Sequence, residues 1–210
     1  MNLIHFFLQH HEEILELTLE HLWLVGISTA LAVLIGIPLG IVSARWPAWN
    51  RPVLGTANII QTVPSLALFG FLLPVPWIGA RADRLAILAL TLYALLPVIR
   101  NTYTGIRGVD SSVVEAGRGM GLTDRQLLFQ VELPLAMSVI LSGVRVAVVV
   151  SVGLATIAAA IGAGGLGEFI FRGLAMVNND LILAGAIPAA ILALSADFGL
   201  GWLEKRLRPL

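Results

Sequence analysis

The feature of the sequence that most constrains the fold is a run from Leu22 to Ala44 that contains no charged side chain. A helix rises about 1.5 Å per residue and the hydrocarbon core of a bilayer is about 30 Å thick, so roughly 20 mostly apolar residues are enough to cross it. Similar stretches follow along the chain. Charged residues make up only 12% of it, whereas they make up about a quarter of soluble domains. The sequence therefore predicts an all-α membrane protein.

The apolar stretches predict about five transmembrane helices. The second stretch is charge-free from Pro52 to Ala80, which is too long for a straight crossing, so we expect it to kink and to end near Pro74. The third stretch is shorter and carries Arg100 near its end. Besides the second, the spans are expected over Leu22–Ala44, Leu85–Ile106, Leu133–Ile161 and Leu181–Leu203.

The basic residues predict how the helices cross the membrane, because Lys and Arg collect in short cytoplasmic loops. With the N-terminus outside, nine basic residues fall in inner segments and three in outer ones. This orientation puts residues 81–84 outside, and it puts residues 107–132 and the tail 205–210 in the cytoplasm. The transmembrane domain is then residues 22–204. The inner nine are Arg45, Arg51, Arg100, Arg107, Arg118, Arg125, Lys205, Arg206 and Arg208, and the outer three are Arg81, Arg84 and Arg172.

The segment before the first span, residues 1–21, holds four glutamates and four histidines, and we expect an interfacial helix there. It lacks the basic n-region of a signal peptide, so we expect the first span to remain in the mature protein. No two of its histidines have the i, i+4 spacing that places two ligands on one helix face, so we expect no metal site. These histidines are His5, His10, His11 and His21.

The polar loop over residues 107–132 predicts a pair of short helices. Ser112–Glu115 has the pattern of a capping box, which would begin a helix at Val113. Gly119 and Gly121 favour a left-handed turn at its end, and Thr123–Gln126 is a second capping box that begins the next helix. These capping signals alone are also compatible with a plain connector on the membrane surface.

The segment from Glu115 to Pro134 resembles the Glu-Ala-Ala…Gly…Ile-x-Leu-Pro signature of binding-protein-dependent ABC importer permeases. The spacing matches throughout, although Gly117 replaces the second alanine and Val131 the isoleucine. In that family this loop inserts into a groove of the ATPase subunit, so the resemblance implies an ATPase-coupling loop. The residues that would carry this role are Glu115, Ala116, Gly117, Gly121, Leu133 and Pro134.

The resemblance covers roughly residues 22–204, and three further segments look like the osmoprotectant branch of the family. It implies a multi-pass permease of a bacterial or archaeal cytoplasmic membrane that carries glycine betaine, choline or carnitine by alternating access. The implied partners are a separate ATPase, a second permease subunit and an extracytoplasmic binding protein that does much of the selecting. The three segments are Gln61–Leu68, Leu96–Gly105 and Ile161–Gly167.

Other signals mainly exclude functions. The chain has no cysteine, which excludes disulfides and thiolate metal sites, and no basic block that would recommend nucleic acid as a partner. Gly162–Gly167 matches a dinucleotide-binding pattern, but an apolar membrane helix precedes it instead of a strand, so we expect a close-packed outer bend and no cofactor. The chain lacks a P-loop motif, so ATP hydrolysis is expected on another chain.

Two charges inside spans, with three residues of the second span, are the candidates for the translocation path or for helix packing. Arg145 lies about 17 Å into the fourth span, near mid-membrane. Asp197 of the fifth span could pair with it, and a structural ion pair and a role in the path both remain open. The second span offers Asn58, Gln61 and Pro64.

Three alternatives remain at this point. A permease of this type could carry another small polar solute, such as an amino acid. An intramembrane enzyme would need a nucleophile and a base in one bundle, but the predicted spans contain serines and no histidine. A channel would be expected to show a ring of pore-lining charges, and the sequence shows no such pattern.

Overall fold

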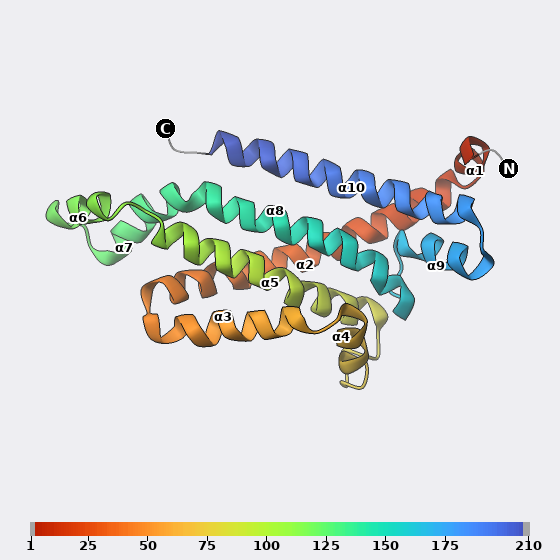
Figure 1. Ribbon diagram of the computed structural model, residues 1–210, viewed down its shortest axis with the longest axis horizontal. Helices are drawn as coiled ribbons and strands as arrows, with labels where there is room; N and C mark the ends of the chain where they lie inside the picture. Colours follow the sequence, from red (N-terminus) through yellow and green to blue (C-terminus); the bar gives the residue numbers. More distant parts are fainter. Residues whose placement is uncertain (1–2, 208–210) are drawn as a thin grey trace.

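The computed structural model describes residues 3–207, and within that range the chain is helical with no strand (Figure 1). Residues 1–2 and 208–210, including Arg208 of the predicted tail, lie outside the described residues. The helices are α1 (Leu3–Gln9), α2 (His11–Arg45), α3 (Pro47–Thr62), α4 (Ser65–Leu72), α5 (Ala82–Arg107), α6 (Ser111–Gly119), α7 (Asp124–Leu127), the π-helix η1 (Leu128–Glu132), α8 (Leu133–Ala158), the 3₁₀ turn η2 (Ala159–Ile161), α9 (Gly167–Met176) and α10 (Asn179–Arg206).

Four helical stretches among the described residues are long and apolar enough to cross a membrane: α2, α5, the continuous run from α7 to η2, and α10. The pair α3 and α4 passes the same test as a fifth, although its two halves are bent by 101°. The bend lies at Val63 and Pro64, where the proline has no amide hydrogen and disfavours a helical conformation in the residue before it. The structure thus has four candidate spans, or five if the bent pair is one span, which agrees with the prediction of about five.

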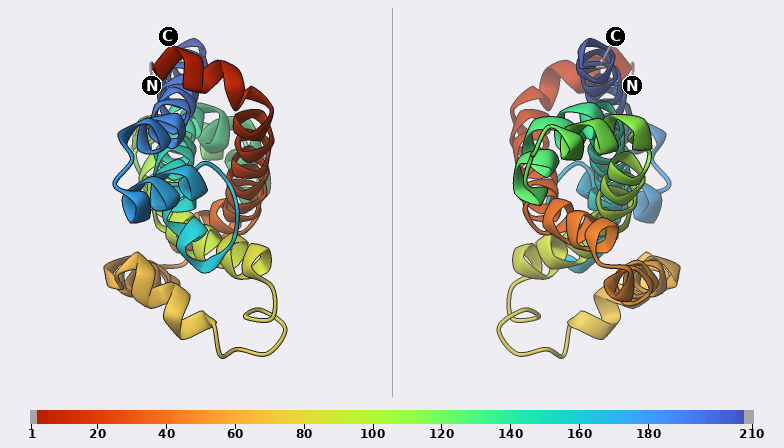
Figure 2. Two further views of the ribbon diagram at one scale, coloured as in Figure 1. Left: turned by 90° about the vertical axis from the view of Figure 1, so that its right-hand side faces the viewer. Right: turned by 90° about the vertical axis from the view of Figure 1, so that its left-hand side faces the viewer.

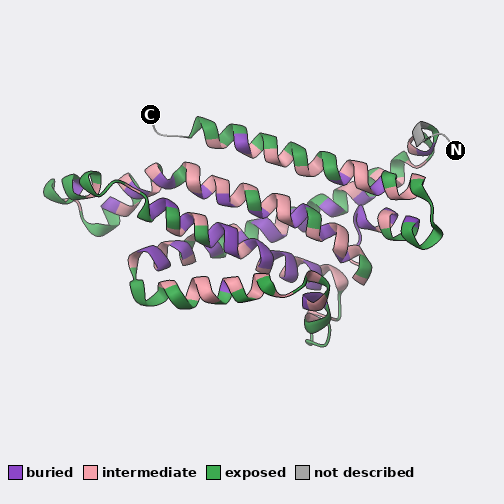
Figure 3. Ribbon diagram, in the orientation of Figure 1, coloured by how far each residue is buried: buried purple, intermediate pink, exposed green. Residues whose placement is uncertain are grey.

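Helix α5 lies at the centre and packs against α2, α3, α4 and α8. Figure 3 shows how much of it is buried, in contrast to α10 on the outside of the bundle. Glycines bring α2 close to α5: a Cβ on Gly36 would lie 2.8 Å from Val98 Cγ1, and one on Gly40 would lie 2.5 Å from Thr102 Cβ. Because lipid tails are as apolar as the side chains, such close packing is what holds membrane helices together.

The helix of the first span begins at His11, well before the predicted Leu22. Two of the four glutamates of this early part have partners: the Arg172 guanidinium lies 2.5 Å from the Glu13 carboxylate, and the Gly165 amide donates to Glu20 at 2.9 Å. Leu17 packs into an apolar cluster with residues of α9 and α10. The helix of the first span therefore continues back into the segment for which an interfacial helix was predicted.

The two ends of the bundle hold different segments. Figures 1 and 2 show α6, α7 and the end of α10 at one end, and α1, α9 and the start of α5 at the other. The predicted loop over residues 107–132 and the C-terminal helix end therefore share one end, opposite the N-terminal helix. This arrangement follows from an odd number of crossings.

Candidate functional site

Helix α6 begins at Ser111, and its cap is Asp110, whose carboxylate accepts from the Ser112 amide at 2.8 Å. The predicted capping box over Ser112–Glu115 with a helix start at Val113 is therefore wrong. Hydrogen bonds from Ser112 lower the pKa of the exposed Asp110 carboxyl. Asp, Ser and Asn cap helices about equally well, so the residue that the chain reaches first after α5 takes the position.

The turn after α6 depends on Gly121. Its φ is +84°, in the left-handed region, and its amide donates to the Arg118 carbonyl at 2.9 Å. The next amide, of Leu122, reaches back to the Gly117 carbonyl at 3.1 Å. These bonds close the end of α6, so the predicted glycine turn is confirmed at Gly121, while Gly119 is the last residue of the helix.

The second loop helix, α7, begins as predicted. The Thr123 hydroxyl accepts from the Gln126 amide, and the Gln126 side chain accepts from the Thr123 amide at 2.9 Å. Leu127 of α7 is fully buried beneath α6, where a Cβ on Gly117 would lie 2.7 Å from Leu127 Cδ1. Glycine at the position where the signature has alanine therefore lets the two loop helices pack closely.

The loop runs into the fourth span without a break. A π-helical turn, Leu128–Glu132, joins α7 to α8, and Leu133 and Pro134 form the first turn of α8. Proline is tolerated there because a first-turn amide has no helical partner. Glu115 and Ala116 lie at exposed positions on α6. The structure thus gathers all six predicted loop residues into one helix, turn and helix.

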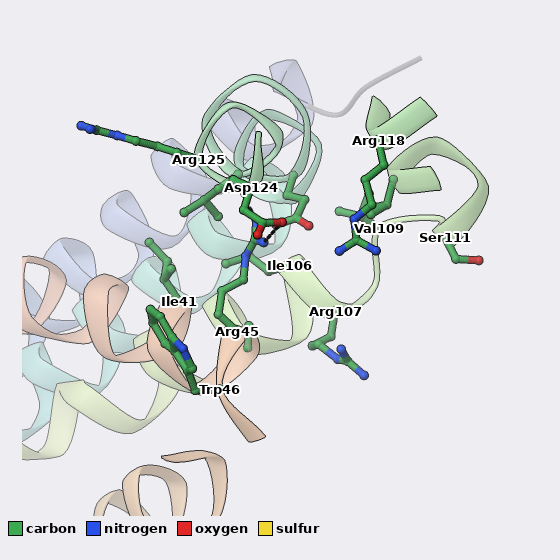
Figure 4. A pocket seen from close by; sticks show the side chains of 14 residues that line it. Ile41, Arg45, Trp46, Ile106, Arg107, Val109, Ser111, Arg118, Asp124 and Arg125 are labelled. Atoms are coloured by element: carbon green, nitrogen blue, oxygen red, sulfur yellow. Dashed lines mark hydrogen bonds and ion pairs between the residues drawn. The ribbon is translucent and has the colours of Figure 1, made fainter. Parts of the chain in front are cut away.

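A cleft of about 690 Å³ separates the loop helices from the ends of α2 and α5 (Figure 4). Arg45, the last residue of α2, reaches across it and donates to the Glu132 carboxylate at 2.6 Å and to the Asp124 carbonyl at 3.2 Å. Sequence reasoning missed this contact, because Arg45 and Glu132 are 87 residues apart and a single sequence carries no signal for such a pair. The cleft is also lined by Arg107, Val109, Ser111, Val114, Arg118 and Arg125, among others.

The candidate residues of the second span lie along a polar seam with α5. Asn58 accepts from Arg100 at 2.7 Å, and Gln61 donates to the Tyr93 carbonyl at 3.3 Å. The Tyr93 hydroxyl in turn donates to the Val63 carbonyl, which the bend at Pro64 leaves without a helical partner. These contacts tie the broken span to the central helix.

The two charges inside spans are brought together. The Arg145 guanidinium of α8 binds both carboxylate oxygens of Asp197 on α10, at 2.6 and 2.8 Å, and Glu204 lies 3.5 Å away. A Cβ on Gly201 would lie 2.9 Å from the guanidinium, so the small residue makes room for it. The charge of Arg145 is therefore neutralised by a neighbouring helix, as a guanidinium at membrane depth requires.

The glycine segment is a bend between η2 and α9. Gly162, Gly164 and Gly165 all have positive φ, and the preceding element is helical, which does not fit a dinucleotide-binding turn. The bend packs on α2, where Glu20 binds the Gly165 amide and His21 is fully buried. His21 therefore lies in the same helix as the first predicted span, one residue before the predicted start of that span. Among residues 3–207 no cluster of histidine and carboxylate side chains has the arrangement of a metal site.

Comparison with known proteins agrees with these features. The family model described as "Binding-protein-dependent transport system inner membrane component" matches residues 36–209. Among curated proteins, the carnitine transport permease protein OpuCB of Listeria monocytogenes is 45% identical over 99% of this chain and 94% of its own length. The osmoprotectant import permease protein OsmW of Salmonella typhimurium is 42% identical over 100% of this chain and 98% of its own. The choline transport system permease protein OpuBB of Bacillus subtilis is 41% identical over 99% and 94%.

Solved structures share the fold. An inward-facing structure of the MetNI methionine ABC transporter superposes with a TM-score of 0.81, at 23% identity, over 90% of this chain and 93% of the matched one. The family match covers more than half of the sequence, and the curated relatives cover nearly all of it. The chain therefore belongs to the family of binding-protein-dependent transport system inner membrane components, as a multi-pass ABC importer permease subunit and not an enzyme.

Proposed function

We propose that this permease imports a small quaternary-amine osmoprotectant, such as glycine betaine, choline or carnitine, by alternating access. The support comes from the relatives, whose names give carnitine, choline and osmoprotectants as cargo at 41–45% identity across nearly the whole chain. The paired state of Arg145 agrees with a cargo that carries a quaternary ammonium group, because the positive charge of Arg145 is taken up by Asp197 and Glu204. An unpaired cation along the path would repel such a solute.

The helix, turn and helix over residues 107–132 is the part of this chain that couples to the ATPase. Family membership implies an ATPase and a substrate-binding protein as partners. The single observation that carries the coupling role is the geometry of the loop: it is capped at Asp110 and Thr123, turns at Gly121 and runs without a break into α8. Movement of such a loop is passed directly into a span. Caps and a fixed turn would also suit a plain connector on the membrane surface, and the resemblance of Glu115–Pro134 to the family signature favours the docking role.

In this proposal the loop and the end of α10 face the cytoplasm and α1 faces outside, as the nine basic residues against three favour. A second permease subunit, identical or homologous, completes the path. Asn58, Gln61 and Pro64 lie on the broken second span beside α5, and we assign them to its positioning along the path.

The test is to purify the permease with its ATPase and binding protein and to measure ATP hydrolysis with a panel of solutes. Quaternary amines should stimulate hydrolysis through the loaded binding protein. If only amino acids stimulate hydrolysis, the proposed cargo is wrong, but the assignment as an ATP-driven importer still holds. Failure of any ATPase to copurify would contradict the coupling role itself.

A further inference from the structure

The ion pair between Arg45 and Glu132 joins two parts of the chain that the coupling mechanism needs to connect. Arg45 is the last residue of α2, and Glu132 is the last residue of the π-turn before α8. The distance between Arg45 Nη2 and Glu132 Oε2 is 2.6 Å, and their side chains are only 19% and 9% exposed. A buried charge-assisted contact of this length orients both groups strongly.

The guanidinium also holds the start of α7. Its Nη2 donates to the Asp124 carbonyl at 3.2 Å, and its Nη1 lies 3.9 Å from the Asp124 carboxylate, as the close-up in Figure 4 shows for these side chains. The planar Arg45 guanidinium thus contacts both ends of the segment from α7 to η1, at Asp124 and at Glu132. Lysine, a single ammonium point, does not reproduce that bridging geometry.

The segment that Arg45 holds has the features of a joint. Leu128–Glu132 is a π-helical turn, and π-turns within helices are frequent at functional sites. Beneath it lies an apolar cluster that includes Ala44, Ile106 and Ala136, from α2, α5 and α8. Beside it lies the 690 Å³ cleft, which leaves the loop helices room to tilt.

From this geometry we infer that Arg45 is a positioning residue for coupling: through Glu132 and Asp124 it passes the tilt of the loop to α2. Without Arg45, movement of the loop would be transmitted to the spans mainly through α8, because α7, η1 and α8 form one uninterrupted helical run. With it, α2 moves together with α8, and the reversal at Trp46 and Pro47 carries the movement on into α3. This inference rests on the proposed coupling role of the loop.

The test is the number of solute molecules transported per ATP hydrolysed, in proteoliposomes that contain the permease, its ATPase and its binding protein. Arg45→Gln, a change on α2 outside the loop, should reduce this ratio about fivefold or more, the lower range of typical coupling effects, while ATPase binding and basal hydrolysis persist. Glu132→Gln should reduce the ratio by a similar factor. Arg45→Lys should give an intermediate ratio. The charge-reversed double variant Arg45→Glu/Glu132→Arg should recover part of it. The matched control is Arg81→Gln, which removes an exposed ion pair with Asp83 at the other end of α5.

The outcomes separate this inference from the proposed function. Wild-type ratios in Glu132→Gln and Arg45→Gln would overturn the inference and leave the coupling loop standing. Loss of ATPase binding in the wild-type complex would contradict the proposed function itself. If the single variants do not reach the membrane, the Lys and charge-reversed variants decide: a normal amount of Arg45→Lys with an unchanged ratio means that the pair is only structural and the inference fails.

Discussion

The backbone of Gly121 gives the sharpest prediction about the coupling loop. A Cβ at this position would meet no atom within 4 Å, so Gly121→Val creates no clash. What it changes is the backbone, because φ is +84° and an L-residue in the left-handed region loses about 1–2 kcal/mol, with β-branched residues the least suited. A strain of that size lowers the ratio of correctly turned to misdirected loops by roughly 5–30-fold.

We expect the Gly121→Val protein to reach the membrane in near-normal amount, since insertion depends on the hydrophobicity of spans that the change does not touch. The transport rate should fall with the fraction of loops that are correctly turned. The ATPase should either dissociate or no longer respond to the loaded binding protein. The assay is solute uptake and ATPase stimulation in the reconstituted complex, normalised to permease content.

The matched control is Gly119→Val, two residues earlier. This glycine is the last residue of α6, and a Cβ there also meets nothing within 4 Å. In a helix valine is no worse than glycine, so the same side chain is added without backbone strain. Wild-type transport and ATPase response in Gly121→Val would refute the reasoning. If both variants were equally impaired, the added side chain on the loop surface would be the cause, and not the strained backbone of the turn.

Three further predictions concern other parts of the chain. Asp197→Asn should lower the thermal stability of the purified permease, because Arg145 loses the carboxylate that binds it at two points, and Asp197→Glu should lower it less; an unchanged melting temperature would show that the pair is dispensable. Asn178→Ala should cost about 1 kcal/mol of stability, since the Asn178 side chain accepts from two amides at the start of α10, whereas Asn178→Asp should be nearly silent in the same melting assay. Asp124→Cys, in a chain with no native cysteine, should react with an impermeant thiol reagent in inside-out vesicles only, and labelling from outside intact cells would reverse the proposed topology.

The sequence predicted those features that depend on local chemistry. Apolar length located the spans, because the bilayer sets that length whatever the packing. The length and prolines of the second span predicted that it bends, and the bend lies at Pro64. The reciprocal pairing of Thr123 with Gln126 predicted the start of α7. Gly121 was predicted as the turn because few other residues tolerate its backbone.

The features that sequence reasoning missed depend on partners distant in the chain. Asp110 and Ser112 are both good caps, and the path of the chain out of α5 decides between them. The early start of α2 depends on Arg172 and on the Gly165 amide, which satisfy Glu13 and Glu20. The pairing of Arg145 with Asp197, by contrast, was anticipated as one possibility, because charges inside spans are expected to find partners.

Nothing in the sequence indicated that Arg45 binds Glu132 and Asp124 of the loop. Arg45 reads in the sequence as the charge that ends an apolar run, and a basic residue at that place is expected of many cytoplasmic span ends. Glu132 reads as one more charge of a polar loop. Only the packing of α2 beside the π-turn shows that the two form one contact.

The most direct test of the account is uptake of labelled glycine betaine, choline and carnitine into proteoliposomes that hold the permease, its ATPase and its binding protein. With ATP on the side of the coupling loop and the loaded binding protein on the other, the account predicts accumulation of at least one of these solutes against its gradient. It also predicts that Gly121→Val reduces this accumulation while Gly119→Val does not. ATP-independent equilibration of the solutes, or accumulation that survives Gly121→Val unchanged, would contradict it.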